Sequence, residues 1–369
     1  MSTKASSSNQ ITSSIRYFAS SNSGEGFISY FDKIFDISKF ERVIILKGGP
    51  GTGKSSFMKK TRDLARRYNT PYDEILCSSD PDSLDGIIIR SNKGNIAILD
   101  GTSPHTLDPK IPGVIDELID LGKYWDQKRL LTSKEEIISL QKLKSDSYKN
   151  AYAILSAAKT CLKRKQDLLS ECIIRDKLNK AITRLILSKH SNKNKQETIY
   201  RINNAISAKG PFSCDLYNEQ LTNSIPVFGV HGAAFYIIKA IADRAFCNNY
   251  SSWISPSPLQ PKIIDGIFIE DVGLSFYDAG KYSPICDDKK CKCINSERFL
   301  DQKMLKEIKP ILRNLSQLYE VTMKNAYIQL SKSKNYHFQL EKIYTHAMDF
   351  SKIEKEESYI KDIVKAFCV

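Results

Sequence analysis

An apolar segment followed by a glycine-rich loop constrains the fold of this chain more than any other feature. Residues 43–56 read Val-Ile-Ile-Leu-Lys-Gly-Gly-Pro-Gly-Thr-Gly-Lys-Ser-Ser. The β-branched run predicts a buried strand, and the apolar residues Phe57, Met58 and Leu64 predict a helix directly after the loop. Glycines permit positive φ angles and a close approach of the backbone to a ligand. The segment therefore predicts a strand–loop–helix unit of an α/β fold.

The loop has the residue types and the spacing of a phosphate-binding loop. Backbone N–H groups in such a loop surround a polyphosphate, and the dipole of the following helix points at the anion. Lys54 would reach the β- and γ-phosphates, and Ser55 would coordinate Mg²⁺. We therefore expect ATP and Mg²⁺ as cofactors. The predicted nucleotide-binding residues are Gly48, Gly49, Pro50, Gly51, Thr52, Gly53, Lys54, Ser55 and Ser56. The alternative is a strand-to-helix turn without a ligand.

Two acidic residues stand where predicted strands end, at the edge where open α/β sheets bind ligands. Asp100 ends the apolar run 95–100 and is the predicted second ligand of Mg²⁺, unless it only ends the strand. Asp80 follows the strand 74–77 and is the first candidate for a general base, ahead of Asp82 and Asp85. Capping of the next turn is the competing explanation for all three. Lys54, Asp80 and Asp100 are thus the predicted catalytic residues.

Three further side chains have open roles. His105 could sense the γ-phosphate or cap a loop. Arg201 and Arg244 are candidate donors that would complete the site from the second half, although surface solvation is the competing expectation.

The chain contains an internal repeat. Lys149-Asn150-Ala151-Tyr152 returns as Lys324-Asn325-Ala326-Tyr327, and the segment 85–89 returns at 265–269. The strand 96–100 returns at 272–278, and the openings of the two halves also correspond. Landmarks in one order at nearly constant separation indicate a tandem duplication.

The repeat predicts a second loop at residues 227–234. Its register places Ala233 opposite Lys54 and Ala234 opposite Ser55, so both reactive side chains are missing. Gly229, Gly232 and a following apolar helix could preserve the strand–turn–helix. We therefore expect the second half to keep the fold and to lose nucleotide binding.

The predicted architecture is α/β, with two related P-loop NTPase domains. Each is expected to have a mostly parallel sheet flanked by helices and a long helical hairpin of its own. The predicted divisions are a disordered tail at 1–14, a domain with the intact loop and a basic hairpin at 15–190, and a degenerate repeat at 198–369. A transit peptide is the alternative for the tail.

Positive charge is concentrated in one segment. The chain has a net charge of +13, and residues 121–210 hold 20 Lys/Arg against 8 Asp/Glu. A basic helical segment can attract nucleic acid or an anionic surface, so a protein or nucleic-acid partner is possible here, but a solvated helix face is the competing interpretation. No apolar run is long enough to predict a membrane span.

Cysteine usage indicates a reducing environment. The nine cysteines show no disulfide-like pairing, which fits a cytoplasmic protein. Cys286, Cys291 and Cys293 lie close enough in sequence to hold a metal, but a fourth ligand is missing nearby, which favours a solvated loop.

These motifs resemble a family of bacterial proteins with tandem P-loop ATPase repeats. The resemblance rests on residues 47–55, on Cys-Ser-Ser-Asp-Pro-Asp-Ser-Leu-Asp-Gly at 77–86 and on Ile-Leu-Asp-Gly-Thr-Ser-Pro-His at 98–105, and it continues through Gly113 and 121–125. It implies ATP binding and ATPase activity. The second repeat of that family usually carries its own phosphate loop, and this chain departs there.

The predicted function is therefore a Mg²⁺-dependent ATPase with one nucleotide site and a regulatory or structural second repeat. One alternative is a small-molecule or nucleoside kinase, in which Asp80 activates an acceptor hydroxyl. The other is a non-enzymatic, ATP-gated interaction module that uses the basic segment.

Overall fold

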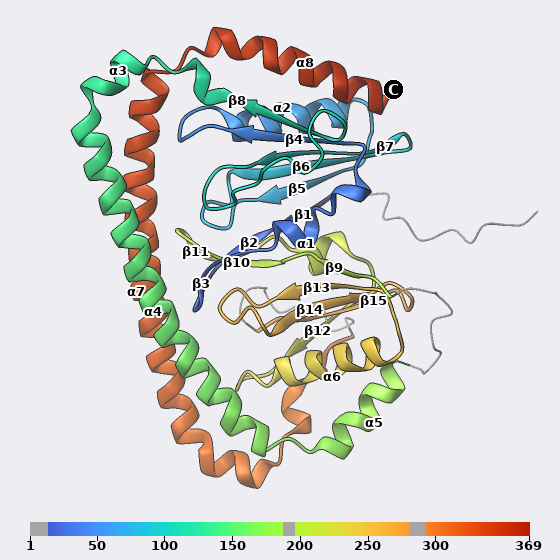
Figure 1. Cartoon of the computed structure of the whole chain (residues 1–369). Helices are drawn as coiled ribbons and strands as arrows, with labels where there is room; N and C mark the ends of the chain where they lie inside the picture. Colours follow the sequence, from blue (N-terminus) through green and yellow to red (C-terminus); the bar gives the residue numbers. More distant parts are fainter. Residues whose placement is uncertain (1–13, 187–195, 281–291) are drawn as a thin grey trace, which may run out of the picture.

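The computed structural model describes residues 14–186, 196–280 and 292–369. Figure 1 shows two α/β lobes stacked on each other, with two long helices spanning both lobes along one side. The α/β class predicted from the sequence is confirmed. No described helix combines the length and the apolar character that a membrane span requires. The predicted N-terminal tail falls almost entirely outside the described residues.

The first lobe is built on a six-stranded mixed sheet in the order β1-β5-β6-β7-β4-β8. Strand β6 runs antiparallel to both of its neighbours, and the remaining pairs are parallel. The strands are β1 (Ile15–Phe18), β4 (Arg42–Lys47), β5 (Tyr72–Leu76), β6 (Leu84–Ser91), β7 (Gly94–Asp100) and β8 (Asp116–Asp120).

The second lobe repeats this topology strand for strand. Its sheet has the order β9-β13-β14-β15-β12-β16, with β14 antiparallel to both neighbours. The strands are β9 (Thr198–Tyr200), β12 (Ser224–Phe228), β13 (Ser252–Pro256), β14 (Ile264–Ile269), β15 (Leu274–Asp278) and β16 (Ile294–Asn295). Each lobe also carries a small antiparallel hairpin, β2 (Ser20–Ser23) with β3 (Gly26–Ser29) and β10 (Asn204–Ser207) with β11 (Gly210–Ser213).

The strand before the glycine-rich loop is buried as its sequence predicts. Val43, Ile44, Ile45 and Leu46 of β4 are all buried, as a strand with parallel neighbours on both sides requires. Helix α2 (Lys54–Arg67) follows the loop and packs its buried face against β6. In the second lobe, α6 (Ala234–Cys247) occupies the same place after β12. Shorter helices, α1 (Phe31–Ile34), η1 (Ile37–Lys39) and η3 (Leu216–Gln220), lie in the corresponding connections.

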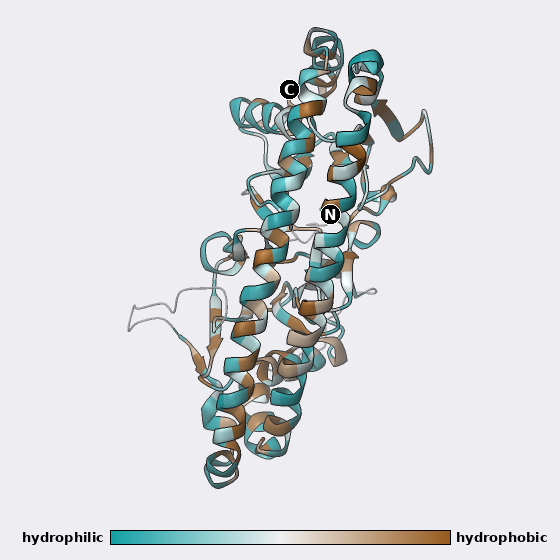
Figure 2. Cartoon of the chain, turned by 90° about the vertical axis from the view of Figure 1, so that its left-hand side faces the viewer, coloured by the Kyte–Doolittle hydropathy of each residue, from teal (hydrophilic) through white to brown (hydrophobic). Residues whose placement is uncertain are grey.

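The two long helices do not form a hairpin within each repeat, and that prediction was wrong. Helix α4 (Lys134–Glu171), preceded by α3 (Gln127–Thr132), packs along α7 (Gln302–His346), one helix coming from each repeat. Figure 2 shows them side by side over the height of the molecule, with hydrophilic and hydrophobic residues mixed on the outer face. Their shared core contains Ala151, Leu155, Met323, Ala326 and Leu330.

The short helices that end each repeat are exchanged between the lobes. Helix α5 (Arg175–Leu185) ends the first repeat, yet Leu178 and Ile182 pack into the core of the second lobe. Helix α8 (Phe350–Cys368) ends the second repeat and buries Ile360 and Val364 in the first lobe, against α2. A cut between residues 190 and 198 would therefore leave each lobe without one of its helices.

The crossing points are equivalent at both ends of the helix pair. Asp126 N donates to Ala347 O at 2.7 Å, and Asp301 N donates to Cys172 O at 2.7 Å. The same separation of 175 residues relates Asp126 to Asp301 and Cys172 to Ala347. The turns before these points, η2 (Leu121–Tyr124) and η4 (Ser296–Phe299), also correspond. The long helices can therefore be compared residue by residue.

Buried charges join the two lobes. Arg201, which follows β9, lies over the ring of Tyr17 at 4.2 Å and 3.7 Å from the carboxylate of Asp73. Arg90 reaches the same carboxylate at 3.0 Å. Burial raises the pKa of Asp73, and the two guanidinium groups oppose that shift. A buried ion-pair cluster of Asp73, Arg90 and Arg201 thus holds the two lobes together, in addition to apolar packing.

Candidate functional site

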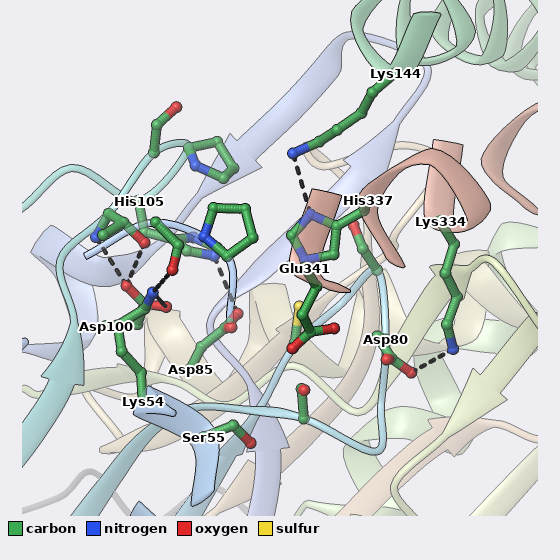
Figure 3. A pocket seen from close by; sticks show the side chains of 18 of the residues that line it. Lys54, Ser55, Asp80, Asp85, Asp100, His105, Lys144, Lys334, His337 and Glu341 are labelled. Carbon is green, nitrogen blue, oxygen red and sulfur yellow. Dashed lines mark hydrogen bonds and ion pairs between the residues drawn. The ribbon is translucent and has the colours of Figure 1, made fainter. Parts of the chain in front are cut away.

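A cavity of about 950 Å³ opens between the glycine-rich loop and the long helix pair. It lies at the edge of the first sheet where β4, β5 and β7 end, which is where open α/β sheets bind ligands. All nine predicted nucleotide-binding residues, 48–56, line it, together with Asp80 and Asp100. The predicted catalytic, nucleotide-binding and metal-binding residues thus line one cavity. Figure 3 labels Lys54, Ser55, Asp80 and Asp100 among them.

The loop requires glycine at the positions where its backbone turns. The φ angles of Gly48, Gly51 and Gly53 are 144°, 71° and 83°, a region that residues with a side chain rarely adopt. A Cβ atom on Gly51 would also come within 2.5 Å of Thr345 Oγ1 and 2.7 Å of Glu341 O. Helix α7 of the second repeat therefore packs directly against the loop of the first.

Lys54 is held at the centre of this loop. It begins α2, and its Nζ donates hydrogen bonds to Gly48 O at 2.7 Å and Gly49 O at 3.0 Å. The same atom is 3.7 Å from Asp100 Oδ2. Burial lowers the pKa of Lys54, while the carboxylate of Asp100 opposes the shift. The loop therefore presents a desolvated ammonium group on its inner side.

Asp100 and Ser55 supply oxygen atoms on either side of this ammonium group. Asp100 Oδ1 accepts a hydrogen bond from Thr102 N at 2.8 Å, and Ser55 Oγ accepts one from Leu84 N at 3.0 Å. Burial raises the pKa of Asp100, and the Lys54 charge and the Thr102 hydroxyl act against that rise. Both side chains are held in place by backbone groups.

These two residues fit the requirements of Mg²⁺ bound with a phosphate chain. Such an ion is usually held by one or two protein oxygens and completes its shell with phosphate oxygens and water. Asp100 Oδ2 lies 3.7 Å from Lys54 Nζ, which is longer than a hydrogen bond. This oxygen is therefore available to coordinate a metal ion. Within residues 14–186, 196–280 and 292–369, no cluster of three or more His, Cys, Asp or Glu side chains could hold a metal by itself.

His105 is anchored by an ion pair. Its Nε2 lies 3.1 Å from Asp85 Oδ2, and its ring stacks on Phe31 with a centroid distance of 4.8 Å. Burial lowers the pKa of His105, but the Asp85 carboxylate outweighs it and the net shift is upward. Both side chains line the cavity, so Asp85 serves first to hold His105.

The other two acidic candidates have different surroundings. Asp80 lines the cavity, and its Oδ1 accepts a hydrogen bond from Lys334 Nζ at 2.8 Å. Lys334 belongs to α7 of the second repeat. Asp82 is exposed, pairs with Lys209 and does not line the cavity. Of the three, only Asp80 keeps a carboxylate oxygen facing the cavity without holding a histidine.

The long helices contribute functional candidates that the sequence analysis missed. The cavity-lining residues fall at helical spacing on one face of each helix: Gln141, Lys144, Ser145, Tyr148 and Tyr152 of α4, and Leu330, Lys334, His337, Phe338 and Glu341 of α7. The signal in the sequence was the helical spacing of polar residues such as Gln141, Lys144 and Ser145. The role of these residues could not be assigned without knowing which lobe each helix face contacts.

Three of these side chains carry or neighbour charge inside the cavity. Lys144 Nζ lies 3.2 Å from His337 Nδ1. Burial, reinforced by the charges of Lys144 and Lys54, lowers the pKa of His337 to about 4, so this ring is neutral at pH 7. Among the described residues no ion pair engages the carboxylate of Glu341, which Figure 3 places between Lys54 and Lys334.

Around the second sheet, the positions equivalent to Lys144, His337 and Glu341 are uncharged, whereas Lys159 keeps the charge of Lys334. The constant separation along the long helices places Tyr319 where the first lobe has Lys144, and Leu162 where it has His337. Gln166 likewise takes the place of Glu341.

The strand-end turn of the second lobe has changed in the same way. The matching turns Ser83 N to Asp80 O and Ile263 N to Gln260 O identify Gln260 as the equivalent of Asp80. Gln260 and Gln166 exchange hydrogen bonds of 2.9 and 3.0 Å in the interior. Asp80 and Glu341 of the first cavity thus correspond to neutral, packed glutamines in the second lobe.

The second loop has also lost its cationic side chain. Helices α2 and α6 both contain 14 residues, and they begin at Lys54 and Ala234. Ala234 therefore stands in the place of Lys54, and Phe235 in that of Ser55. The predicted register, with Ala233 opposite Lys54, was therefore wrong by one residue.

An internal carboxylate occupies the second loop. Glu297 Oε1 accepts a hydrogen bond from His231 N at 3.0 Å, and a Cβ on Gly229 would lie 2.0 Å from Ser296 Oγ. The residue of the first lobe equivalent to Glu297 is Gly122, at the same position in η2. The space beside the second loop is therefore filled by the chain itself.

The remaining predictions concern residues away from the cavity. Arg201 lies in the lobe interface and Arg244 on α6, so neither lines the cavity as a donor. Cys293 is exposed, while Cys286 and Cys291 lie outside the described residues.

The basic segment is partly neutralised by the fold. Several of its side chains form ion pairs, many with acidic residues outside the segment: Lys123, Lys149, Lys159, Arg201 and Lys209. The excess positive charge is therefore smaller at the surface than its count in the sequence suggests.

Comparison with known proteins found no match among family models, curated proteins or solved structures.

Proposed function

We propose that the first lobe binds one Mg²⁺–nucleoside triphosphate, with ATP as the expected nucleotide, and hydrolyses it. The observation that carries this proposal is the contrast between the two lobes. One topology occurs twice, but Ala234, Gln260, Tyr319 and Gln166 replace Lys54, Asp80, Lys144 and Glu341 of the first copy. A structural role alone would not require these charges to differ between the copies.

The residues of the first lobe have separate tasks in this proposal. The N–H groups of residues 51–56 and the ammonium group of Lys54 would neutralise the charge that develops on the transferred phosphoryl group. Ser55 and Asp100 would hold Mg²⁺, which supplies further charge neutralisation when bound. Because α4 and α7 line one side of the cavity, these electrostatic interactions would be stronger than in bulk water.

Two carboxylates are available to orient the attacking water. Asp80 faces the cavity with one oxygen engaged by Lys334, and Glu341 faces it with no ion pair among the described residues. Glu341 therefore joins Asp80 as a candidate general base. Glu341→Gln and Asp80→Asn, tested separately for hydrolysis rate and nucleotide affinity, distinguish the two, because loss of a base lowers the rate more than the affinity.

The direct test of this function measures calorimetric binding of ATP and release of phosphate, with Mg²⁺ and with a chelator. Asp100→Asn should weaken the Mg²⁺ dependence of both. The matched control is Asp278→Asn, because Asp278 ends β15 as Asp100 ends β7. Equal responses of the two variants, or no ATP binding by the unaltered protein, would contradict the proposal.

A kinase is the second candidate function, and the extent of the cavity favours it. The cavity continues beyond the loop to the helix faces of α4 and α7, where polar side chains could receive a second substrate. Phosphate transfer to an added acceptor, in place of transfer to water, would identify this activity.

A further inference from the structure

Lys144 is a cation directed into the cavity without an acidic partner. Its side chain projects from α4 toward His337, and among the described residues the contact of Nζ with Nδ1 of that ring is the one polar contact of this side chain (Figure 3). Burial lowers the pKa of Lys144, and no carboxylate counteracts the shift. Burying an ammonium group without a counter-charge costs free energy, so such a group indicates a position where a ligand supplies the anion.

His337 adds a hydrogen-bond donor at the same place. Because Lys144 Nζ donates to Nδ1 and the ring is neutral at pH 7, the proton of this tautomer is on Nε2. A neutral imidazole with a fixed tautomer can donate to an anion beside the ammonium group.

The wall next to these two groups is aromatic and polar. The rings of Tyr148 and Tyr152 stack at 5.9 Å, and Tyr148 Oη donates to Ser79 Oγ at 3.3 Å. The Asp80–Lys334 ion pair lies nearby, because Lys334 is about one helical turn before His337 on α7. This end of the cavity therefore offers a cation, neutral donors and an aromatic surface, which together suit a small polar molecule.

The comparison of the lobes argues against a purely structural role for Lys144. The helix pair packs equally well with Tyr319 at the equivalent position and with Leu162 in place of His337. Of the two copies described, the one that retains the intact loop carries this half-buried cation.

We propose that the part of the cavity between α4 and α7 is a second subsite, where Lys144 and His337 bind the carboxylate or phosphate group of a small anionic molecule beside the nucleotide. The role of this subsite depends on the proposed function, because its ligand would bind next to the triphosphate. Its binding chemistry depends on residues outside the loop, so it can be measured separately.

The experiment is a calorimetric titration with two probes, inorganic phosphate and succinate, in a chloride buffer of low ionic strength. The loop is first saturated with Mg²⁺ and a non-hydrolysable ATP analogue, so that phosphate cannot bind there. We expect at least one probe to bind the unaltered protein, and Lys144→Met to weaken its affinity at least about tenfold. Which probe binds distinguishes a phosphate ligand from a carboxylate ligand.

Two further variants keep the test decisive. Lys159→Met removes another lysine of α4, one that pairs with Glu25 outside the cavity, and should leave probe binding unchanged. Lys144→Arg keeps the charge and should retain binding if Lys144→Met fails to fold.

The outcomes separate the two proposals. Absence of probe binding, or binding that Lys144→Met leaves unaltered, overturns the subsite. Absence of binding of the ATP analogue overturns the proposed function instead, and the same titrations without nucleotide then test whether Lys144 binds an anion.

Discussion

Replacement of Lys54 by alanine should weaken nucleotide binding strongly without unfolding the first lobe. In the present structure its ammonium group donates to Gly48 O and Gly49 O. A hydrogen bond to a charged group contributes about 1.5–3 kcal/mol, and two phosphate oxygens can accept from Lys54. Because the two carbonyl contacts are given up in exchange, we expect the lower part of that range, a loss of about 3–4 kcal/mol. This corresponds to an affinity reduced about 100- to 1,000-fold.

Stability should respond much less to the same substitution. Removal of Lys54 relieves the desolvation of a buried ammonium group, which favours the variant. The substitution also removes the positive charge 3.7 Å from Asp100, which destabilises the folded variant. Since these effects oppose each other, we expect the free energy of unfolding to change by no more than about 1 kcal/mol.

Calorimetry with Mg²⁺–ATP and urea unfolding measure the two quantities on the same protein. Val230→Glu is the control, because Val230 is exposed in the second loop and a negative charge there would repel a nucleotide bound to that loop. An affinity that is unchanged in Lys54→Ala, or that falls in Val230→Glu, would refute the reasoning.

Three other substitutions test separate parts of the structure. Asp73→Ala leaves two guanidinium groups without their buried carboxylate and should lower the free energy of unfolding in urea by about 3–5 kcal/mol. A decrease below about 1 kcal/mol would contradict a stabilising ion-pair cluster between the lobes. The low pKa of His337 means that the unfolded chain binds a proton at this residue more readily than the folded chain does. The free energy of unfolding should therefore fall as the pH falls from about 6.5 to about 4, by up to about 1.4 kcal/mol per pH unit. His337→Leu should flatten this slope, and equal slopes for the two proteins would contradict the prediction. Gly51→Ala should lower ATP affinity more than Gly232→Ala, because both positions have positive φ but only a Cβ at Gly51 meets α7; equal effects would argue against this contact.

Much of the site could be predicted because its signals are local. The glycines of the loop 48–56 predict its conformation, and Asp100 is identified by the apolar strand that it ends. The repeat was visible for a similar reason, since short segments such as 149–152 and 324–327 keep their order.

The contribution of the second repeat to the first cavity could not be predicted in this way. Helical periodicity shows that α4 and α7 each have a buried face, but it does not identify the partner of that face. The predicted hairpins satisfied the same apolar pattern as the observed pairing between repeats. Lys334, His337 and Glu341 reach the cavity only because of that pairing.

The register of the second loop failed for a related reason. A loop can lose one residue without disturbing the strand before it or the helix after it, because loops tolerate changes in length. The two helix starts, Lys54 and Ala234, fix the equivalence that the loop residues leave open.

The most direct test of the central claim is an experimental structure of the chain with Mg²⁺ and a non-hydrolysable ATP analogue. We predict one nucleotide per chain, with its phosphates within hydrogen-bonding distance of Lys54 and the loop 48–56, and none at residues 229–233, where Glu297 accepts from His231. A nucleotide at the second loop, or a first cavity that stays without one at saturating concentration, would contradict the account.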